Sequence, residues 1–223
     1  PNWLQSEILI NTDSGTEGEV YMGCAGGIDC TATLPLSRET LPAGFTTLKL
    51  TLKGLKGGHS GAEIHLGLGN ASKLLARFLA DNTDALGLRL LDFTGGTLRN
   101  AIPREAIVTL AVAADKADAL KAAAQEFLAT IQFELSAVEK KIAFVVEAAE
   151  SNAKALTAET QGKFLALLNA TPNGVIRMSD DVKGVVETSL NVGVVTMKDD
   201  EVAINSLIRS LIDSGKEYVV SML

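Results

Sequence analysis

The sequence predicts an α+β protein of the ferredoxin-like class, in which a split βαββαβ core forms an antiparallel sheet with helices on one face. Hydrophobic residues make up 47% of the 223 residues, which is enough for a sizeable core. Only 4% are aromatic, so Leu, Val, Ile and Ala must build that core, and these residues favour helices packed on sheets. Strand-type and helix-type hydrophobic spacing alternate in the order strand, helix, strand, strand, helix, strand.

Strands are expected first along the chain. Two short strands are predicted over 7–12 and 18–22, with a polar turn between them, and the second leads into the glycine-containing stretch 23–27. Alternating apolar and polar residues then predict strands over 30–37 and 45–55. We expect the latter two to pair with each other, with one face in water.

A glycine-rich segment, 57–61, separates these strands from a helix. Apolar residues recur at helical spacing from 68 onward, which predicts that helix. Strands are predicted next over 88–93 and 105–113. The sequence between them, 95–103, is polar and glycine-rich and ends in proline, so it is expected to be a loop.

A single long helix is predicted over 118–150, because apolar residues recur there in alternating steps of three and four. At about 1.5 Å per residue this helix would be roughly 45 to 50 Å long. A shorter helix is predicted over 158–169, where a proline and an Asn-Gly pair then stop it. The additional helical length distinguishes this chain from a minimal ferredoxin-like core.

A hairpin and a helix are expected at the end of the chain. Strands over 185–197 and 202–212 flank a Lys-Asp-Asp turn. Ser214 and Glu217 have the spacing of a capping box, which predicts a last helix entering 218–223. The sequence begins without methionine and stops just inside this helix, so we expect it to be a piece of a longer protein.

Charge and composition exclude several classes of function. The net charge is −7 and the 20 basic residues are scattered, so no basic patch indicates nucleic-acid binding. No apolar run reaches the roughly 20 residues that span a bilayer, and Pro1 to Glu7 do not resemble a signal peptide. Cys24 and Cys30 are too few for a disulfide framework in a chain of this length. We therefore expect a cytoplasmic protein with no nucleic-acid or membrane partner.

The strongest catalytic candidate is His59, which lies between glycines and Ser60 at a predicted strand-to-helix turn. The small neighbours leave room for a ligand, and an imidazole there can donate a hydrogen bond to a developing oxyanion. The alternative is that His59 only caps a helix or fills a polar gap, which is the more common role of a single histidine. The other histidine, His65, is poorly spaced for joint metal binding, and we interpret it as structural.

Three further polar residues are candidates for binding a substrate or a metal. Asn100, in the loop 95–103, offers hydrogen-bond donors and an acceptor. Arg209 lies in an otherwise apolar strand, where it could bind a carboxylate or, about equally, face solvent. Asp13 ends an apolar segment, as metal ligands in α/β enzymes do, although an aspartate there is more often a turn residue.

Several enzyme classes are excluded by missing motifs. Two histidines are too few for this chain to assemble a metallohydrolase centre alone. Ser60 has no Gly-x-Ser-x-Gly elbow, which argues against a serine hydrolase. No complete dinucleotide or Walker motif is present, so a nucleotide-dependent enzyme is not indicated.

Four motifs, taken together, resemble one family. They are Ile-Leu-Ile-Asn-Thr-Asp at 8–13, Leu-Lys-Gly-Gly-His-Ser-Gly at 55–61, Gly-Gly-Thr-Leu-Arg-Asn-Ala-Ile-Pro at 95–103 and Ile-Arg-Ser at 208–210. In this order they resemble the bacterial aminoacyl-histidine dipeptidases, or peptidase D, which are related to carnosinase and carboxypeptidase G. The likeness runs essentially the whole length of the chain and corresponds to the middle of those enzymes.

The resemblance implies a cytosolic dipeptidase that hydrolyses Xaa-His and other dipeptides. Its catalytic domain would hold two zinc ions, and its lid domain would mediate formation of a homodimer. Residues 1–26 would be the edge of the catalytic domain, and 27–223 would be the lid and dimerisation domain.

The resemblance also implies roles for the candidate residues. Asp13 would ligate one zinc, and His59 would reach the active site of the neighbouring subunit. Asn100 and Arg209 would hold the backbone and the terminal carboxylate of the dipeptide substrate. These roles agree with the chemistry of the side chains, since a guanidinium binds a carboxylate through two hydrogen bonds.

The remaining zinc ligands and the general-base glutamate of the family have no counterpart in the chain. One carboxylate cannot supply a zinc coordination shell, so we expect the isolated chain to bind no zinc tightly and to hydrolyse no dipeptide. An alternative is a stand-alone ferredoxin-like module that binds a small molecule through Asn100 and Arg209. A self-sufficient mononuclear metalloenzyme is the third interpretation, which the two histidines make improbable.

Overall fold

Residues 6–8, 10, 17–20 and 24–223 are described by a computed structural model. The strands are β1 (Gly26–Pro35), β2 (Arg38–Glu39), β3 (Phe45–Lys53), β4 (Gly58–His59), β5 (Arg89–Gly95), β6 (Ala101–Ile102), β7 (Ala106–Ala113), β8 (Ala143–Ala148), β9 (Ala155–Leu156), β10 (Gly174–Met178), β11 (Val186–Met197) and β12 (Glu201–Ser210). The α-helices are α1 (Ala71–Leu86), α2 (Ala117–Glu134), α3 (Ala158–Ala170) and α4 (Asp213–Met222). Short 3₁₀ helices are η1 (Ile64–Leu66) and η2 (Ala114–Lys116).

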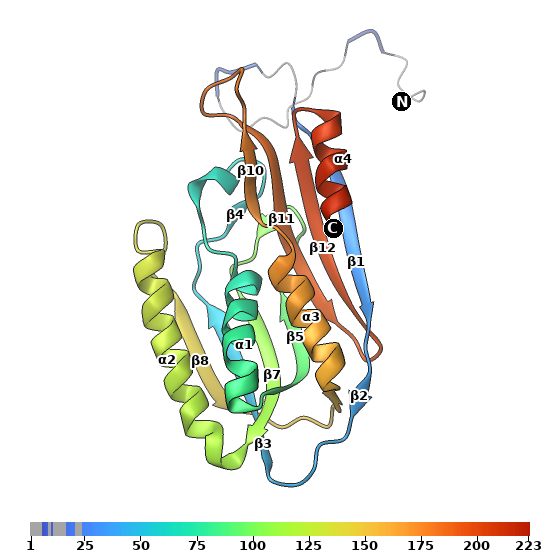
Figure 1. The fold of residues 1–223 in the computed structure, drawn as a ribbon. Coiled ribbons are helices and arrows are strands. Elements are labelled where there is room, and N and C mark those ends of the chain that lie inside the picture. The colour runs from blue at the N-terminus through green and yellow to red at the C-terminus, as the bar shows by residue number, and fades with distance from the viewer. Residues whose placement is uncertain (1–5, 9, 11–16, 21–23) are drawn as a thin grey trace.

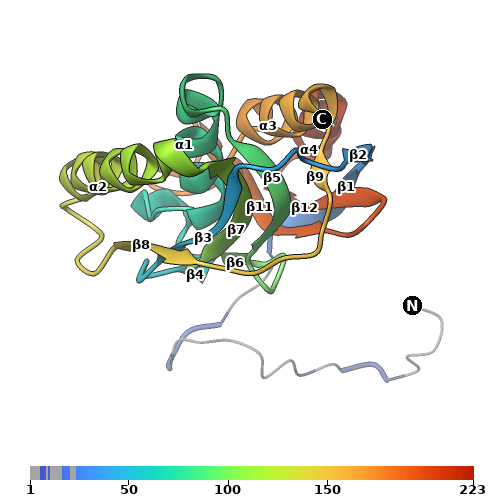
Figure 2. The same ribbon diagram turned by 90° about the horizontal axis from the view of Figure 1, so that it is seen from below.

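The described residues form an α+β fold around one large antiparallel sheet. Its strand order is β1-β12-β11-β5-β7-β3-β8, and β10 pairs with β11 as well. Figures 1 and 2 show the four helices on one face of this sheet, as the sequence predicts. The sheet is larger than the predicted split βαββαβ core, because β1, β10, β11 and β12 extend it beyond β5.

The core lies between the sheet and the helices. On β3, the alternate residues Leu48, Leu50 and Leu52 are buried in it. Helix α1 contributes Leu75 and Phe78, both fully buried. Apolar alternation along the strands and helical spacing along α1 therefore place their apolar side chains in the same layer.

The predicted helix over 118–150 is wrong in its second half. Helix α2 ends at Glu134, and β8 (Ala143–Ala148) follows as an edge strand paired with β3. The apolar spacing of three and four continues across the intervening turn by coincidence. The backbone of β8 instead completes the hydrogen-bond ladder with β3, while Phe144 packs into the core.

Two other local expectations are corrected. The strands predicted over 30–37 and 45–55 do not pair with each other, because β1 pairs with β12 while β3 lies between β7 and β8. The capping box is also wrong, since Ile212 is the N-cap of α4 and makes no side-chain cap hydrogen bond. In the first case, pairing with distant strands decides the arrangement.

The first two strand predictions fall partly outside the described residues. Within 7–12 and 18–22, the described positions are 7, 8, 10 and 18–20, and none of them is in a strand. The predicted strands over 88–93, 105–113, 185–197 and 202–212 and the helix over 158–169 are confirmed by β5, β7, β11, β12 and α3. No described helix combines the length and the apolarity needed to cross a membrane.

Lys73 connects two of the helices. Its ammonium group donates hydrogen bonds to the backbone carbonyls of Leu168, Asn169 and Thr171 at the end of α3. The carboxyl end of a helix attracts a cation. Burial lowers the pKa of Lys73 to about 8, so this lysine pays a desolvation cost for joining α1 to α3.

Arg38 joins segments that are far apart in the sequence. Its guanidinium donates hydrogen bonds to the backbone carbonyls of Leu91, Lys154, Lys198 and Asp199. We expect Arg38→Ala to lower the free energy of unfolding by about 2 kcal/mol, since four acceptors lose a charged donor and some of them regain water. Urea unfolding followed by circular dichroism measures the change.

A matched control is Lys163→Ala, which removes a cation from the exposed ion pair with Glu159. Exposed ion pairs contribute little, so this variant is expected to stay within about 0.5 kcal/mol of the unsubstituted chain. Equal stability of the Arg38 and Lys163 variants would contradict the bridging role of Arg38.

Candidate substrate-binding site

The segments that carry His59 and Asn100 lie side by side. Strands β4 and β6 pair with each other, with His59 opposite Ala101. The backbone N–H of Ser60 donates a hydrogen bond of 2.9 Å to the carbonyl oxygen of Asn100. Two of the predicted site residues, which are remote in the sequence, are thus brought together by backbone pairing.

The imidazole of His59 is held in one orientation by its own turn. Its Nδ1 atom accepts hydrogen bonds from the backbone N–H groups of Gly61 at 3.2 Å and Ala62 at 3.1 Å. The backbone N–H of His59 donates to Glu63 Oε2 at 2.8 Å. Because Nδ1 is an acceptor, the hydrogen of the neutral imidazole is assigned to Nε2. His59 therefore caps the turn and also presents an N–H donor on an exposed side chain.

Arg209 approaches the same turn from the sheet. It lies on β12, opposite Gly27 of β1 and Ser189 of β11. A methyl group placed on Gly61 would lie 3.0 Å from Arg209 Nε and 3.1 Å from His59 Cε1. The imidazole and the guanidinium therefore flank Gly61, and a larger residue there would have to push one of them aside.

The guanidinium of Arg209 is available to bind an anion. Its Nε atom is buried and has no hydrogen-bond partner among the described residues. Within the same residues, Arg209 forms no ion pair with a carboxylate. The residue is partly buried on β12. A buried donor without a partner carries a cost that a bound carboxylate would remove.

The loop that carries Asn100 is fixed by a buried asparagine on β11. Asn191 donates hydrogen bonds of 2.9 Å to the carbonyl oxygens of Arg99 and Ala101, the two neighbours of Asn100. Arg99 also forms an ion pair with Asp29 of β1 at 2.7 Å. Asn100 itself is exposed. Its backbone is thus held from both sides while its side chain remains accessible.

Sequence reasoning missed Asn191 and Glu63 as supporting residues. Asn191 is only 1% exposed and lies in an apolar strand. A single amide among apolar strand residues could have indicated a structural role, because buried polar groups form hydrogen bonds. Glu63 accepts a hydrogen bond from the backbone of His59, but nothing in the sequence pattern distinguishes it from a surface glutamate. His65 makes no contact with the residues of this site among the hydrogen bonds and ion pairs of the described chain.

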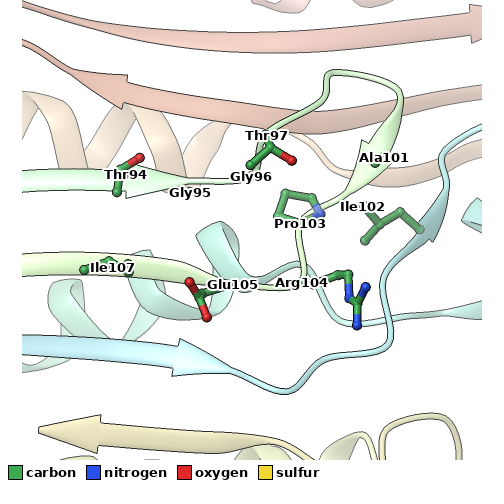
Figure 3. Close-up of a pocket in the computed structure, with 10 residues that line it drawn as sticks. All are labelled: Thr94, Gly95, Gly96, Thr97, Ala101, Ile102, Pro103, Arg104, Glu105 and Ile107. Carbon is green, nitrogen blue, oxygen red and sulfur yellow. The ribbon is translucent and has the colours of Figure 1, made fainter.

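A separate cavity lies beneath the loop that carries Asn100. Figure 3 shows it between the end of β5, the loop and the start of β7, with Arg104 and Glu105 at its wall. Its volume is about 330 Å³. None of His59, Asn100 and Arg209 lines it, so it is distinct from the predicted site.

The described residues do not fit a metal centre. Asp13, the predicted zinc ligand, lies outside them. Among the residues that the structure describes, no group of three or more His, Cys, Asp or Glu side chains could hold a metal ion. A zinc site needs about four converging ligands, so the described part of the chain offers no place for one.

Comparisons with known proteins show similarity to peptidases. Residues 50–139 match the family described as the peptidase dimerisation domain. Over 222 residues the chain is 65% identical to the cytosol non-specific dipeptidase of Escherichia coli K12, and the match covers 100% of this chain and 46% of that protein. Along its whole length, the chain is therefore similar to part of a cytosol non-specific dipeptidase, and it contains a match to the peptidase dimerisation domain.

A solved structure supports the same assignment. The aminoacylhistidine dipeptidase of Vibrio alginolyticus is 54% identical to this chain and superposes with a TM-score of 0.91. The match covers 100% of this chain and 45% of that one. The chain thus spans about half the length of these cytosol non-specific dipeptidase relatives.

Proposed function

We propose that the chain is the lid and dimerisation portion of a metal-dependent dipeptidase that acts on Xaa-His and other dipeptides. The observation that carries this proposal is the convergence of His59, Asn100 and Arg209. Backbone pairing joins the segments of His59 and Asn100, and Arg209 contacts the same turn beside Gly61. Both relatives are dipeptidases, which supports the class of reaction.

The three side chains have complementary roles in this proposal. Arg209 binds the terminal carboxylate of the dipeptide through charge-assisted hydrogen bonds, which satisfy its partnerless Nε atom. Asn100 holds the substrate backbone through its amide group. His59 directs its Nε2–H at the oxyanion that forms when the peptide carbonyl is attacked, because Nδ1 is already occupied by the turn.

The rest of the active site is assigned outside the described residues. In this proposal residues 1–26 belong to the edge of the catalytic domain, where Asp13 ligates one of two zinc ions, and 27–223 form the lid. When bound, zinc supplies an activated water molecule. The isolated chain is then expected to be inactive, since the described residues contain no metal-binding group.

The proposed assembly is a cytoplasmic homodimer formed through the lid. The matched family is described as a dimerisation domain, and the Escherichia coli relative is named as a cytosol protein. Edge strand β8 pairs on only one side among the described strands, so its other edge has backbone groups available for pairing. His59 would contribute to the active site of the partner subunit.

Substitution in the full-length enzyme tests the roles of the site residues. His59→Ala is expected to lower kcat about 100-fold with little change in KM, because its donor acts on the transition state. Arg209→Met is expected to lower kcat/KM about 100-fold for a free dipeptide, and to abolish the preference for a free over an amidated carboxyl terminus. Steady-state kinetics on both substrates measures these effects.

Arg177→Met is the matched control for Arg209. Arg177 is an exposed arginine on β10 that already forms ion pairs with Asp180 and Glu187. This control should retain the kinetics of the unsubstituted enzyme. If Arg209→Met still discriminates against the amidated dipeptide, the carboxylate-binding role is wrong. If His59→Ala keeps full kcat, the oxyanion role is wrong.

A further inference from the structure

One buried carboxylate closes the loop that carries His59. Glu139 is 4% exposed, and each of its two oxygens accepts a backbone hydrogen bond. Oε2 accepts from the N–H of Lys56 at 2.8 Å, and Oε1 accepts from the N–H of Gly69 at 3.0 Å. Lys56 lies just before β4, and Gly69 lies just before Asn70, the N-cap of α1. The two ends of the segment 56–69 therefore meet at Glu139.

Glu139 reaches this position from the turn that follows α2. The N–H of Glu139 donates a hydrogen bond of 2.8 Å to the carbonyl of Leu135, which keeps the turn compact. Its neighbour Val138 packs against the small apolar cluster that contains Ile64 and Leu68. The turn thus contacts the segment 56–69 in two ways. Val138 packs against apolar residues within the segment, and the Glu139 carboxylate binds both of the segment's ends.

The bonds within the segment orient the imidazole but not the segment itself. Nδ1 of His59 is fixed by two N–H groups of the same turn, and Glu63, which binds the backbone of His59, also belongs to the segment. The orientation of the ring relative to the sheet therefore depends on how the segment is attached. Glu139 provides a charged attachment at both ends, and hydrogen bonds to a charged acceptor are stronger than neutral ones.

We propose that Glu139 is a positioning residue for His59. It touches no substrate, and it acts by holding the segment 56–69 so that His59 faces Arg209. This inference rests on the proposed role of His59 in the dipeptidase. It extends that role to the turn after α2, which lies within the matched dimerisation domain, residues 50–139.

The first test measures amide hydrogen exchange in the unsubstituted chain. The N–H groups of Lys56 and Gly69 should exchange slowly, because a buried charged acceptor holds them. Exchange of these two amides at the rate of exposed backbone would overturn the inference. This measurement needs no variant, so it decides the question even if a substitution prevents folding.

The second test uses Glu139→Gln, which keeps the size of the side chain and removes its charge. The glutamine offers one carbonyl oxygen for two N–H groups and turns an NH₂ group toward the other. We expect exchange at Gly61 and Ala62 to rise about 10-fold or more, and the ¹⁵N spectrum of His59 to show a mixture of tautomers. Glu126→Gln, which changes an exposed glutamate on the preceding helix α2, is the matched control and should change neither.

The third test uses kinetics of the full-length enzyme. Glu139→Gln is expected to lower kcat about 10-fold with KM within about twofold, because the group it places acts on the transition state. In a His59→Ala background, Glu139→Gln should not lower kcat further, because the imidazole that Glu139 positions is absent. Additive effects of the two substitutions on kcat would overturn the positioning role.

These tests separate the two proposals. If His59→Ala has full activity, the role of His59 is wrong, whereas the exchange and ¹⁵N measurements still decide whether Glu139 holds the loop. If His59→Ala is impaired but Glu139→Gln leaves the exchange of Gly61 and Ala62 and the tautomer of His59 unchanged, the positioning inference alone is wrong.

Discussion

Replacing Phe78 with alanine is expected to lower the free energy of unfolding by about 3 to 5 kcal/mol. Phe78 lies on α1 and is fully buried. Its ring centroid is 5.3 Å from that of Phe127 on α2 and 5.0 Å from that of Phe144 on β8, and the latter pair is edge-to-face. The substitution leaves a cavity where three elements meet and removes both aromatic pairs. Urea unfolding followed by circular dichroism provides the measurement.

The same helix that carries Phe127 supplies a matched control. Phe133 on α2 is 83% exposed, so Phe133→Ala removes the same side chain without opening a cavity. Its effect should stay within about 0.5 kcal/mol. A loss of less than about 1 kcal/mol for Phe78→Ala would show that α1, α2 and β8 are not held together by this aromatic cluster.

Gly193→Ala is expected to destabilise the protein by about 3 kcal/mol and to displace the loop that carries Asn100. A methyl group on Gly193 would lie 2.5 Å from both the Cα atom and the carbonyl oxygen of Arg99. These are backbone atoms, so no side-chain rotation relieves the contact. The loop must move away from β11, which breaks the hydrogen bonds from Asn191 to Arg99 and Ala101. Urea unfolding and the amide chemical shifts of Asn100 measure the two effects.

Gly162→Ala is the control, and its effect should have the opposite sign. Gly162 lies within α3, and a methyl group there would meet nothing within 4 Å. Replacing an interior helical glycine with alanine stabilises a helix by about 0.5 to 1 kcal/mol. If Gly193→Ala is tolerated as well as Gly162→Ala, the close approach of loop and strand is not required.

Much of the fold could be predicted because local periodicity agreed with tertiary contacts. The alternation in β3 places Leu48, Leu50 and Leu52 on the buried face, and the apolar stripe of α1 faces the same core. Helix α3 begins where predicted, and its N-cap Thr157 accepts a hydrogen bond from the N–H of Thr160. Such elements are set by side chains that are close in the sequence.

The error at β8 has a physical cause. Ile142 and Val145 continue the helical spacing of α2, so periodicity alone could not reveal the turn between α2 and β8. The turn is stabilised by Glu139, whose partners Lys56 and Gly69 are remote in the sequence. Apolar periodicity among neighbouring residues cannot reveal a hydrogen-bond partner that is remote in the sequence. Tertiary contacts here override local spacing.

The candidate residues were predicted one by one from their chemistry, whereas their proximity depends on the fold. His59, Asn100 and Arg209 were each chosen for their chemistry, and the structure brings them together through the pairing of β4 with β6 and the approach of Arg209 to Gly61. The partners of the supporting residues Asn191 and Glu139 could not be predicted, because each binds backbone groups of a segment that is remote in the sequence. Asp13 stays a prediction, since it lies outside the described residues.

The pairing of β1 with β12 has a consequence for how the chain folds during synthesis. Gly26 lies opposite Ser210, so β1 can pair with its partner only after β12, residues 201–210, has left the ribosome. Strands β3, β5, β7 and β8 have partners made earlier and can associate first. Contacts between residues so remote in sequence form slowly, and an unpaired strand exposes its backbone while it waits. The nascent segment 26–35 is therefore without a partner strand for longer than β3, β5 and β7.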